Sequence, residues 1–284
     1  MKIEKIGKII GGQDGAIFKN ELFRFDTKGK CTVFDLSNLG QCKETPLEPI
    51  SEFYLDRLDV VIPHSNAVFF GSEYYGSDDT YPILYTNVYN NYSSSTDKRM
   101  GMLCAYRLKK TENGYETKLL QQIRIGFCDD ELWKASKTDH GVRPYGNFVA
   151  ENGFLFAFVM RNEENGTRFF KFKLPSVRDG EAYQDGVAQL VLEKTDILEY
   201  FDLPYFRFVQ GATMHNGKIY STEGFTGDTL NQPAIRVIDT KTKTEVYYNI
   251  MKRGYPDEAE MIDHLDDKCL YSDINGHLYA GDFD

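Results

Sequence analysis

The chain has 284 residues, of which 41% are hydrophobic and 14% aromatic, and its formal net charge is -10. This apolar share supplies a core and excludes an intrinsically disordered chain. The negative charge argues against nucleic acid and membranes as partners, because nucleic acids and anionic lipid surfaces repel an acidic protein.

A short phrase recurs along the chain: a polar residue, a Gly or Asn, an apolar pair, a turn and then an aromatic strand. It begins at Gln13, His64, Tyr145, Gln210 and, in degraded form, Glu258, with a mean step of about 61 residues. Repetition on this scale indicates copies of one supersecondary unit packed around a shared centre. The long step favours five blades with long loops, and the longest step, from 64 to 145, leaves six blades as the alternative.

The first two units contain runs of β-forming residues separated by turn signals. Unit one has three predicted strands, over 16–18, 21–25 and 31–36, and unit two has four, over 66–70, 82–89, 102–108 and 118–123. Apolar first runs and alternating later runs are typical of propeller blades, whose inner strands are covered on both faces.

The later units follow the same plan. Their predicted strands cover 147–150, 154–160 and 167–174, then 212–214, 218–222, 234–240 and 245–250, and last 259–262, 269–273 and 276–280. Thr195 followed by acidic residues predicts a brief helix over 195–201. Unit five lacks an outer strand, which residues 2–10 would supply, because closure by the two termini removes open sheet edges. We therefore predict one all-β domain over 1–284, a five-bladed β-propeller with four-stranded antiparallel blades.

Three phrases carry a resemblance to a known group of proteins: Gln210-Gly211, Glu258-Ala-Glu260 and the strand run Ala234–Thr240. Over essentially its whole length the chain resembles bacterial β-propeller proteins, especially an uncharacterised five-bladed family. The resemblance implies that residues at the blade starts line the mouth of the central channel. It implies no reaction.

Polar residues at the blade starts would therefore converge from separate units into a wet channel or a ligand site. The candidate ligand-binding residues are Gln13, His64, Asn66, His140, Arg143, Tyr145, Asn147, Gln210 and Glu260. The ligand class that fits them is a small polar molecule, with carbohydrate as one candidate. Trp133 and the tyrosines at 74, 75, 89 and 92 are further candidates for stacking on a sugar ring.

Two other functions remain open, and with them the question whether the protein is an enzyme. A glycosidase-like hydrolase would need two carboxyl groups from opposing blades, one as acid and one as nucleophile or base. The candidates are Asp14, Asp139, Glu258 and Glu260, with Asp14 and Glu260 as the cross-channel pair. A protein-interaction scaffold would instead bind a protein partner through a flat face and the Tyr-rich segment 74–92.

Metal and redox chemistry have little support in the sequence. His64, His140, Asp139 and Glu260 could ligate a divalent ion, but no His-x-His or His-Glu-x-x-His motif is present. We expect no cofactor, and at most an incidental Ca²⁺ or Na⁺ on the axis. We predict that His215 lies in a hairpin turn, and that the two histidines that follow it in the sequence, His264 and His277, are exposed.

The cysteines and the N-terminus bear on the cellular compartment. The five cysteines are widely spaced and form no Cys-x-x-Cys, which fits neither a disulfide framework nor a thiolate zinc site. The first ten residues alternate charged and apolar types and lack the apolar stretch of a signal peptide. We expect a cytoplasmic location.

Overall fold

A computed structural model of the whole chain gives the fold. It describes residues 2–37, 39–40, 45–88, 102–128, 130–133, 146–162, 164–182 and 186–283, and the backbone of 137–138 and 141–142. Asp139, His140, Arg143 and Tyr145, four of the candidate site residues, lie outside the described residues.

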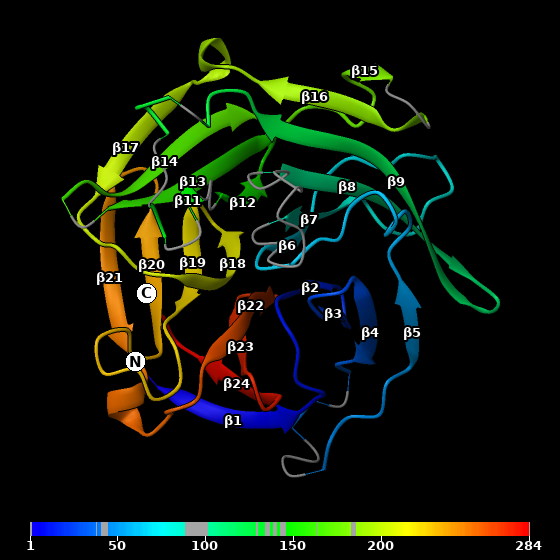
Figure 1. Cartoon of the computed structure of the whole chain (residues 1–284). Helices are drawn as coiled ribbons and strands as arrows, with labels where there is room; N and C mark the ends of the chain where they lie inside the picture. Colours follow the sequence, from blue (N-terminus) through cyan, green and yellow to red (C-terminus); the bar gives the residue numbers. More distant parts are fainter. Residues whose placement is uncertain are drawn as a thin grey trace.

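The strands form small antiparallel sheets arranged in a ring (Figure 1). Blade 1 contains β2 (Gly15–Phe18), β3 (Glu21–Phe25), β4 (Lys30–Asp35) and β5 (Ser51–Tyr54). Blade 2 contains β6 (Val68–Phe70), β7 (Leu84–Val88), β8 (Met102–Thr111) and β9 (Gly114–Ile125). Blade 3 contains β12 (Gly146–Glu151), β13 (Phe154–Asn162), β14 (Gly166–Lys173) and β17 (Glu199–Leu203). Blade 4 contains β18 (Val209–His215), β19 (Lys218–Glu223), β20 (Ala234–Asp239) and β21 (Thr244–Asn249).

The last sheet combines the two ends of the chain. It contains β22 (Ala259–Leu265), β23 (Lys268–Asp273), β24 (His277–Gly281) and, as its outer strand, β1 (Ile3–Lys8), which pairs antiparallel with β24. The chain is a five-bladed β-propeller. Because the N-terminal strand completes blade 5, the ring closes as predicted from the sequence.

The long step between units two and three contains no sixth blade in the described part of the chain. It is taken up by β8 and β9, of 10 and 12 residues, and by the two-residue pair β10 (Lys137–Thr138) and β11 (Gly141–Val142). Two short strands, β15 (Glu181–Ala182) and β16 (Ala188–Leu192), leave blade 3 and extend the sheet of blade 2, where β16 lies parallel to β9. No local pattern in the sequence predicts this exchange between blades.

Tight turns join the first and second strands of blades 1, 3, 4 and 5. Asn152-Gly153 and Asn216-Gly217 both have positive φ at each residue, 52° and 77° in the first pair and 52° and 76° in the second. Two consecutive left-handed residues give the type I′ turn, which matches the twist of a hairpin and favours Asn-Gly. These turns fix the register of the inner strands and so the position of their side chains.

The helix predicted over 195–201 is wrong. A single 3-10 turn, η2 (Lys194–Asp196), is capped by Glu193, and the chain then enters β17. In β17 the exposed Tyr200 and Asp202 alternate with the buried Phe201 and Leu203, and this period of two is that of a strand.

Five hydrophobic clusters fill the five spaces between neighbouring blades. They join blades 1 and 2, 2 and 3, 3 and 4, 4 and 5, and 5 and 1. Trp133 belongs to the second cluster, where it is fully buried and stacked on Phe170 with ring centroids 5.5 Å apart. It is therefore a core residue, and the prediction that it could stack on a sugar is wrong. In the residues described, none of the helices has the length and apolar character needed to cross a membrane.

Candidate functional site

The inner strands β2, β6, β12, β18 and β22 surround the ring axis (Figure 1). The carboxylate of Asp14, next to β2, connects four of their blades. Its Oδ2 accepts hydrogen bonds from the backbone N–H of Val68 (3.1 Å) and Ala212 (3.2 Å), and its Oδ1 accepts one from Ile262 (3.2 Å). Burial raises the pKa of Asp14, while the backbone N–H groups of Gly15, Ala212 and Ile262 and the guanidinium of Arg24 act in the opposite direction. With both oxygens occupied by the backbone, the geometry favours a structural role for Asp14 over a catalytic one.

A second set of polar contacts joins blades 2, 3 and 4. The side-chain amide of Asn87 donates to the backbone oxygen of Gly146 (3.1 Å) and to Oδ1 of Asn147 (3.2 Å). Asn66 donates to the backbone oxygens of Gln210 (3.5 Å) and of the residue before it (3.4 Å). Asn66, Asn147 and Gln210 therefore come together at one end of the inner strands, as the sequence predicts.

Gly211 lies where β18 passes closest to β22. A Cβ at this position would be 2.5 Å from the backbone oxygen of Glu260 and 3.0 Å from Oδ1 of Asp14. We expect Gly211→Ala to lower the free energy of unfolding by about 3 kcal/mol, because forced overpacking shifts the backbone. Urea unfolding measures this, with Gly7→Ala as the control, since its nearest contact is the flexible end of Leu39 at 3.2 Å. Equal losses in the two variants would contradict the close approach.

Arg24 and Glu260 are buried polar residues that keep unpaired atoms. Each is 2% exposed, on β3 and β22 respectively. Nη2 of Arg24 donates to the backbone oxygen of Gly12 (2.7 Å), whereas Nε and Nη1 have no partner among the described residues. Oε2 of Glu260 and Oδ1 of Asn66 are likewise without a partner in that part of the chain. Buried polar atoms are rarely left unsatisfied, so this group indicates bound water or a ligand.

The charges of this group act on one another. Burial lowers the pKa of Arg24 to about 10, opposed by the carboxyl groups of Glu260, Asp14 and Asp273. Burial and the neighbouring Glu258 raise the pKa of Glu260 to about 8, opposed by Arg24. At neutral pH, Arg24 is therefore charged and Glu260 is protonated.

Gln210 and Glu258 form the more exposed edge of the same group. The side-chain amide of Gln210 donates to the carboxylate of Glu258, and Oγ1 of Thr226 accepts a hydrogen bond from the backbone N–H of Glu258 (2.7 Å). Burial raises the pKa of Glu258, and hydrogen bonds to its carboxyl group from the backbone of Thr226 and the side chain of Gln210 oppose that rise. We call Arg24, Asn66, Gln210, Glu258 and Glu260 the axial polar group.

The structure places the remaining predicted residues around this group. Gln13 precedes Asp14 and is half-buried, and His64 is half-buried before Ser65, whose backbone oxygen accepts from the N–H of Asp14 (3.0 Å). Sequence reasoning missed Arg24, because it lies in the second strand of blade 1 and not at a blade start. A charged residue between Phe23 and Phe25 in an apolar strand was the available signal.

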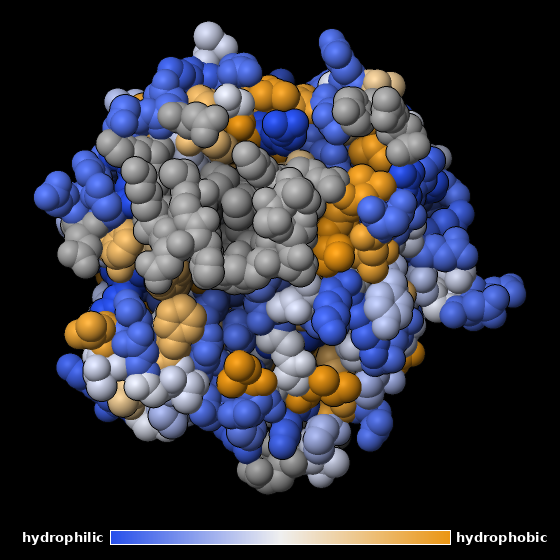
Figure 2. Space-filling view, viewed as in Figure 1, coloured by the Kyte–Doolittle hydropathy of each residue, from blue (hydrophilic) through white to orange (hydrophobic). Residues whose placement is uncertain are grey.

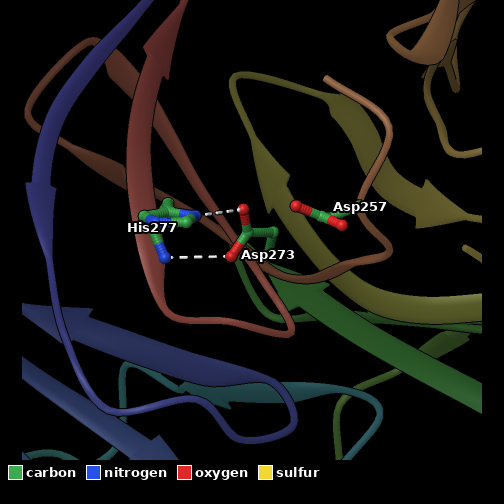
Figure 3. A group of neighbouring side chains, drawn as sticks. All are labelled: Asp257, Asp273 and His277. Atoms are coloured by element: carbon green, nitrogen blue, oxygen red, sulfur yellow. Dashed lines mark hydrogen bonds and ion pairs between the residues drawn. The ribbon is translucent and has the colours of Figure 1, made fainter. Parts of the chain in front are cut away.

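Asp257, Asp273 and His277 form a second cluster, with ligand atoms within 4.8 Å of one another (Figure 3). Oδ1 of Asp273 accepts from the backbone N–H of Asn275 and of His277, both at 2.9 Å. Its Oδ2 contacts Nδ1 of His277 (2.9 Å) and accepts from the hydroxyl of Tyr279 (3.0 Å). Four contacts already occupy this carboxylate, so we assign it to the turn between β23 and β24 and assign no ion. His277 is partly buried and bonded there, so its predicted exposure is wrong.

The opposite end of the inner strands has its own polar contacts. Oδ2 of Asp263 accepts from the backbone N–H of Ile17 (2.6 Å), and its Oδ1 accepts from the hydroxyl of Thr213 (2.9 Å). The ring of His264 stacks on His215 at 4.1 Å, and burial lowers the pKa of His264 to about 3. His264 is thus a packed neutral residue, and its predicted exposure is wrong as well.

A groove of about 660 Å³ lies away from the axis, where β16 crosses from blade 3 to blade 2. Its apolar lining residues are Leu174, Pro175, Leu190, Val191, Leu192 and Leu198. Val191 and Leu198 are 44% and 58% exposed. This groove is one apolar surface of the described residues to which a protein partner would have access.

Comparison with known proteins adds no function to this geometry. No protein-family model matches the sequence, and no curated protein resembles it at a significant level. Among solved structures, the chain is similar to BamB from Moraxella catarrhalis, with 8% identity and a TM-score of 0.37 over 99% of this chain and 61% of BamB. It is also similar to the computationally designed protein Ika8, with 9% identity and a TM-score of 0.38 over 98% of this chain and 99% of Ika8.

Proposed function

We propose that this protein binds a small polar ligand, with a saccharide as the leading candidate, at the axial polar group. One observation carries the proposal: Arg24, Asn66 and Glu260 are buried and keep donor or acceptor atoms without a partner among the described residues. Leaving such atoms unpaired costs about 1–3 kcal/mol each, so a molecule that supplies the missing partners would be stabilised there.

The charges around Arg24 favour a neutral ligand over an anion. The guanidinium already faces the carboxyl groups of Asp14 and Asp273, and the protein as a whole is acidic. An incoming phosphate or carboxylate would meet these groups, whereas a hydroxyl both donates and accepts hydrogen bonds. A polyhydroxy compound can therefore pair with the N–H groups of Arg24 and with the oxygens of Asn66 and Glu260 together.

A thermal-shift panel of neutral sugars, sugar phosphates and divalent ions tests the proposal. A sugar at 100 times its dissociation constant stabilises the folded protein by about 2.7 kcal/mol, which corresponds to a rise in melting midpoint of about 5 °C. We expect this rise with neutral sugars, and we expect Glu260→Gln to reduce it, because an amide presents different donors and acceptors at Oε2.

The matched control for this panel is Glu52→Gln. Glu52 is an exposed carboxylate on β5 that pairs with Lys30 at 2.8 Å, far from the inner strands in its own sheet. The sugar-induced rise should be the same in this variant as in the unmodified protein. A melting midpoint that no compound of the panel moves would refute the proposal.

A hydrolase remains a second candidate because of one observation: burial keeps Glu260 protonated at neutral pH, as a general acid requires. The expected pairing of Glu260 with Asp14 is not supported, since the oxygens of Asp14 are bonded to three backbone N–H groups. Release of nitrophenol from aryl glycosides by the protein, lost in Glu260→Gln, would favour the hydrolase over simple binding.

A protein-interaction scaffold is the third candidate, and the groove beside β16 supports it. On the face shown in Figure 2, apolar side chains form separate patches among hydrophilic ones. Apolar patches of limited size are normal for monomeric proteins. If no compound of the thermal-shift panel changes the melting midpoint, that result would favour the scaffold function over ligand binding.

A further inference from the structure

Three half-buried phenylalanines lie beside the axial polar group, outside the five cores that join the blades. Phe206 and Phe208, in the connection between β17 and β18, pack against Met160 of β13 as a cluster of their own. Phe225, two residues after the end of β19, lies against Phe208 with ring centroids 5.5 Å apart and planes at 53°. We call Phe206, Phe208 and Phe225 the aromatic patch.

The chain connects this patch directly to the polar residues. Phe208 is two residues before Gln210. Thr226 follows Phe225, and its Oγ1 accepts a hydrogen bond from the backbone N–H of Glu258 (2.7 Å). Gln210 in turn donates to Glu258. The aromatic patch and the hydrogen-bonding edge of the axial polar group are therefore neighbours at the same end of the inner strands.

The loop that carries Phe225 is held by its own hydrogen bonds. The backbone N–H of Phe225 donates to the oxygen of Asn231 (2.8 Å), and Oδ1 of Asp228 accepts from the N–H of Leu230 and of Asn231, both at 2.8 Å. Because these bonds hold the loop backbone in place, little conformational entropy of the loop would be lost when a ligand binds to the ring of Phe225.

From this arrangement, and resting on the proposed function, we infer that the ligand carries a ring with an apolar face, as a pyranose does. The ring face packs on the aromatic patch, while hydroxyl groups on its edge bind Gln210, Glu258 and the buried atoms of Arg24 and Glu260. Sites of this kind combine aromatic walls for affinity with a few polar groups for orientation. An open-chain polyol offers the same hydroxyls but no ring face.

Calorimetric titration with two kinds of probe tests the inference. The cyclic probes are the methyl β-pyranosides of glucose, galactose and xylose, and the acyclic probes are sorbitol and xylitol. We expect the unmodified protein to bind at least one pyranoside about tenfold more tightly than the acyclic polyols, and Phe225→Ala to remove most of that difference. Phe225→Tyr should restore it, because the ring face returns.

Two further variants make the result specific. Tyr54→Ala removes an aromatic ring that is 63% exposed on β5, the outer strand of blade 1, and it should leave every affinity unchanged. Phe225→Leu keeps apolar volume without a flat ring, and it replaces Phe225→Ala if the latter does not fold.

The outcomes separate the two proposals. Binding of pyranosides that Phe225→Ala and Phe225→Leu leave unchanged would overturn the ring-face inference and keep the axial site. Equal affinity for pyranosides and acyclic polyols would do the same. Absence of binding by every probe would overturn the proposed function, and the inference that rests on it.

Discussion

Replacing Asp14 by alanine should lower the free energy of unfolding by at least about 4 kcal/mol, a large part of the 5–15 kcal/mol typical of a folded domain. The substitution leaves the backbone N–H groups of Val68, Ala212 and Ile262 without their acceptor at the centre of the ring. Water would have to enter the axis to replace three bonds that join four blades. Urea unfolding followed by far-UV circular dichroism measures the loss.

Asp14→Asn should cost about half as much. An amide oxygen in the place of Oδ2 keeps the bonds from Val68 and Ala212, while the NH₂ group faces the N–H of Ile262. Asp59→Ala is the control, because that carboxylate is 77% exposed and should change stability by less than about 1 kcal/mol. If Asp14→Ala and Asp59→Ala unfold at the same urea concentration, the carboxylate does not hold the blades together.

The repeat structure of the fold could be predicted from the sequence because each blade repeats the same local physics. Apolar runs near Val68, Val149 and Ala212 predict inner strands covered on both faces, and the lack of an outer strand in unit five points to the N-terminal residues. These signals are local or follow from ring closure, and the structure confirms them.

The transfer of β16 from blade 3 to blade 2 could not be predicted in the same way. No strand was predicted over its residues, Ala188–Leu192, and nothing local specifies a parallel partner 67 residues earlier, where Ala188 pairs with Gln121. Long-range pairing of this kind is decided by packing between blades and not by propensity.

The candidate site could be predicted only in part. Blade-start positions predicted that Asn66, Asn147 and Gln210 lie near one another, and the structure places them at one end of the inner strands. That these residues bind a ligand stays a prediction. Arg24 was missed because it lies on the second strand of its blade. A side chain on a second strand lies near the axis only when it extends past the first strand. The burial of a single charged residue depends on tertiary contacts that a period-two pattern does not encode.

The pH dependence of stability should reveal the state of Glu260. Its pKa is about 8 in the folded protein and about 4.5 in the unfolded chain, so the folded state holds the extra proton between these values. The stabilisation from that proton is complete below about pH 4.5 and is lost as the pH rises through 8. Between pH 5 and 9 this amounts to about 4 kcal/mol for a shift of this size.

Glu260→Gln should remove this dependence, because glutamine is a neutral group of nearly the same shape. The difference in unfolding free energy between the variant and the unmodified protein should therefore rise by about 4 kcal/mol in favour of the variant from pH 5 to pH 9. Glu52→Gln replaces an exposed carboxyl and keeps Glu260, so it should show no such rise; Lys30 lowers the pKa of Glu52. Parallel pH profiles for Glu260→Gln and the unmodified protein would mean that Glu260 is charged and solvated in the fold. Water molecules would then supply the missing hydrogen-bond partners of the axial polar group, and the unpaired atoms of Arg24 and Glu260 would not indicate a ligand.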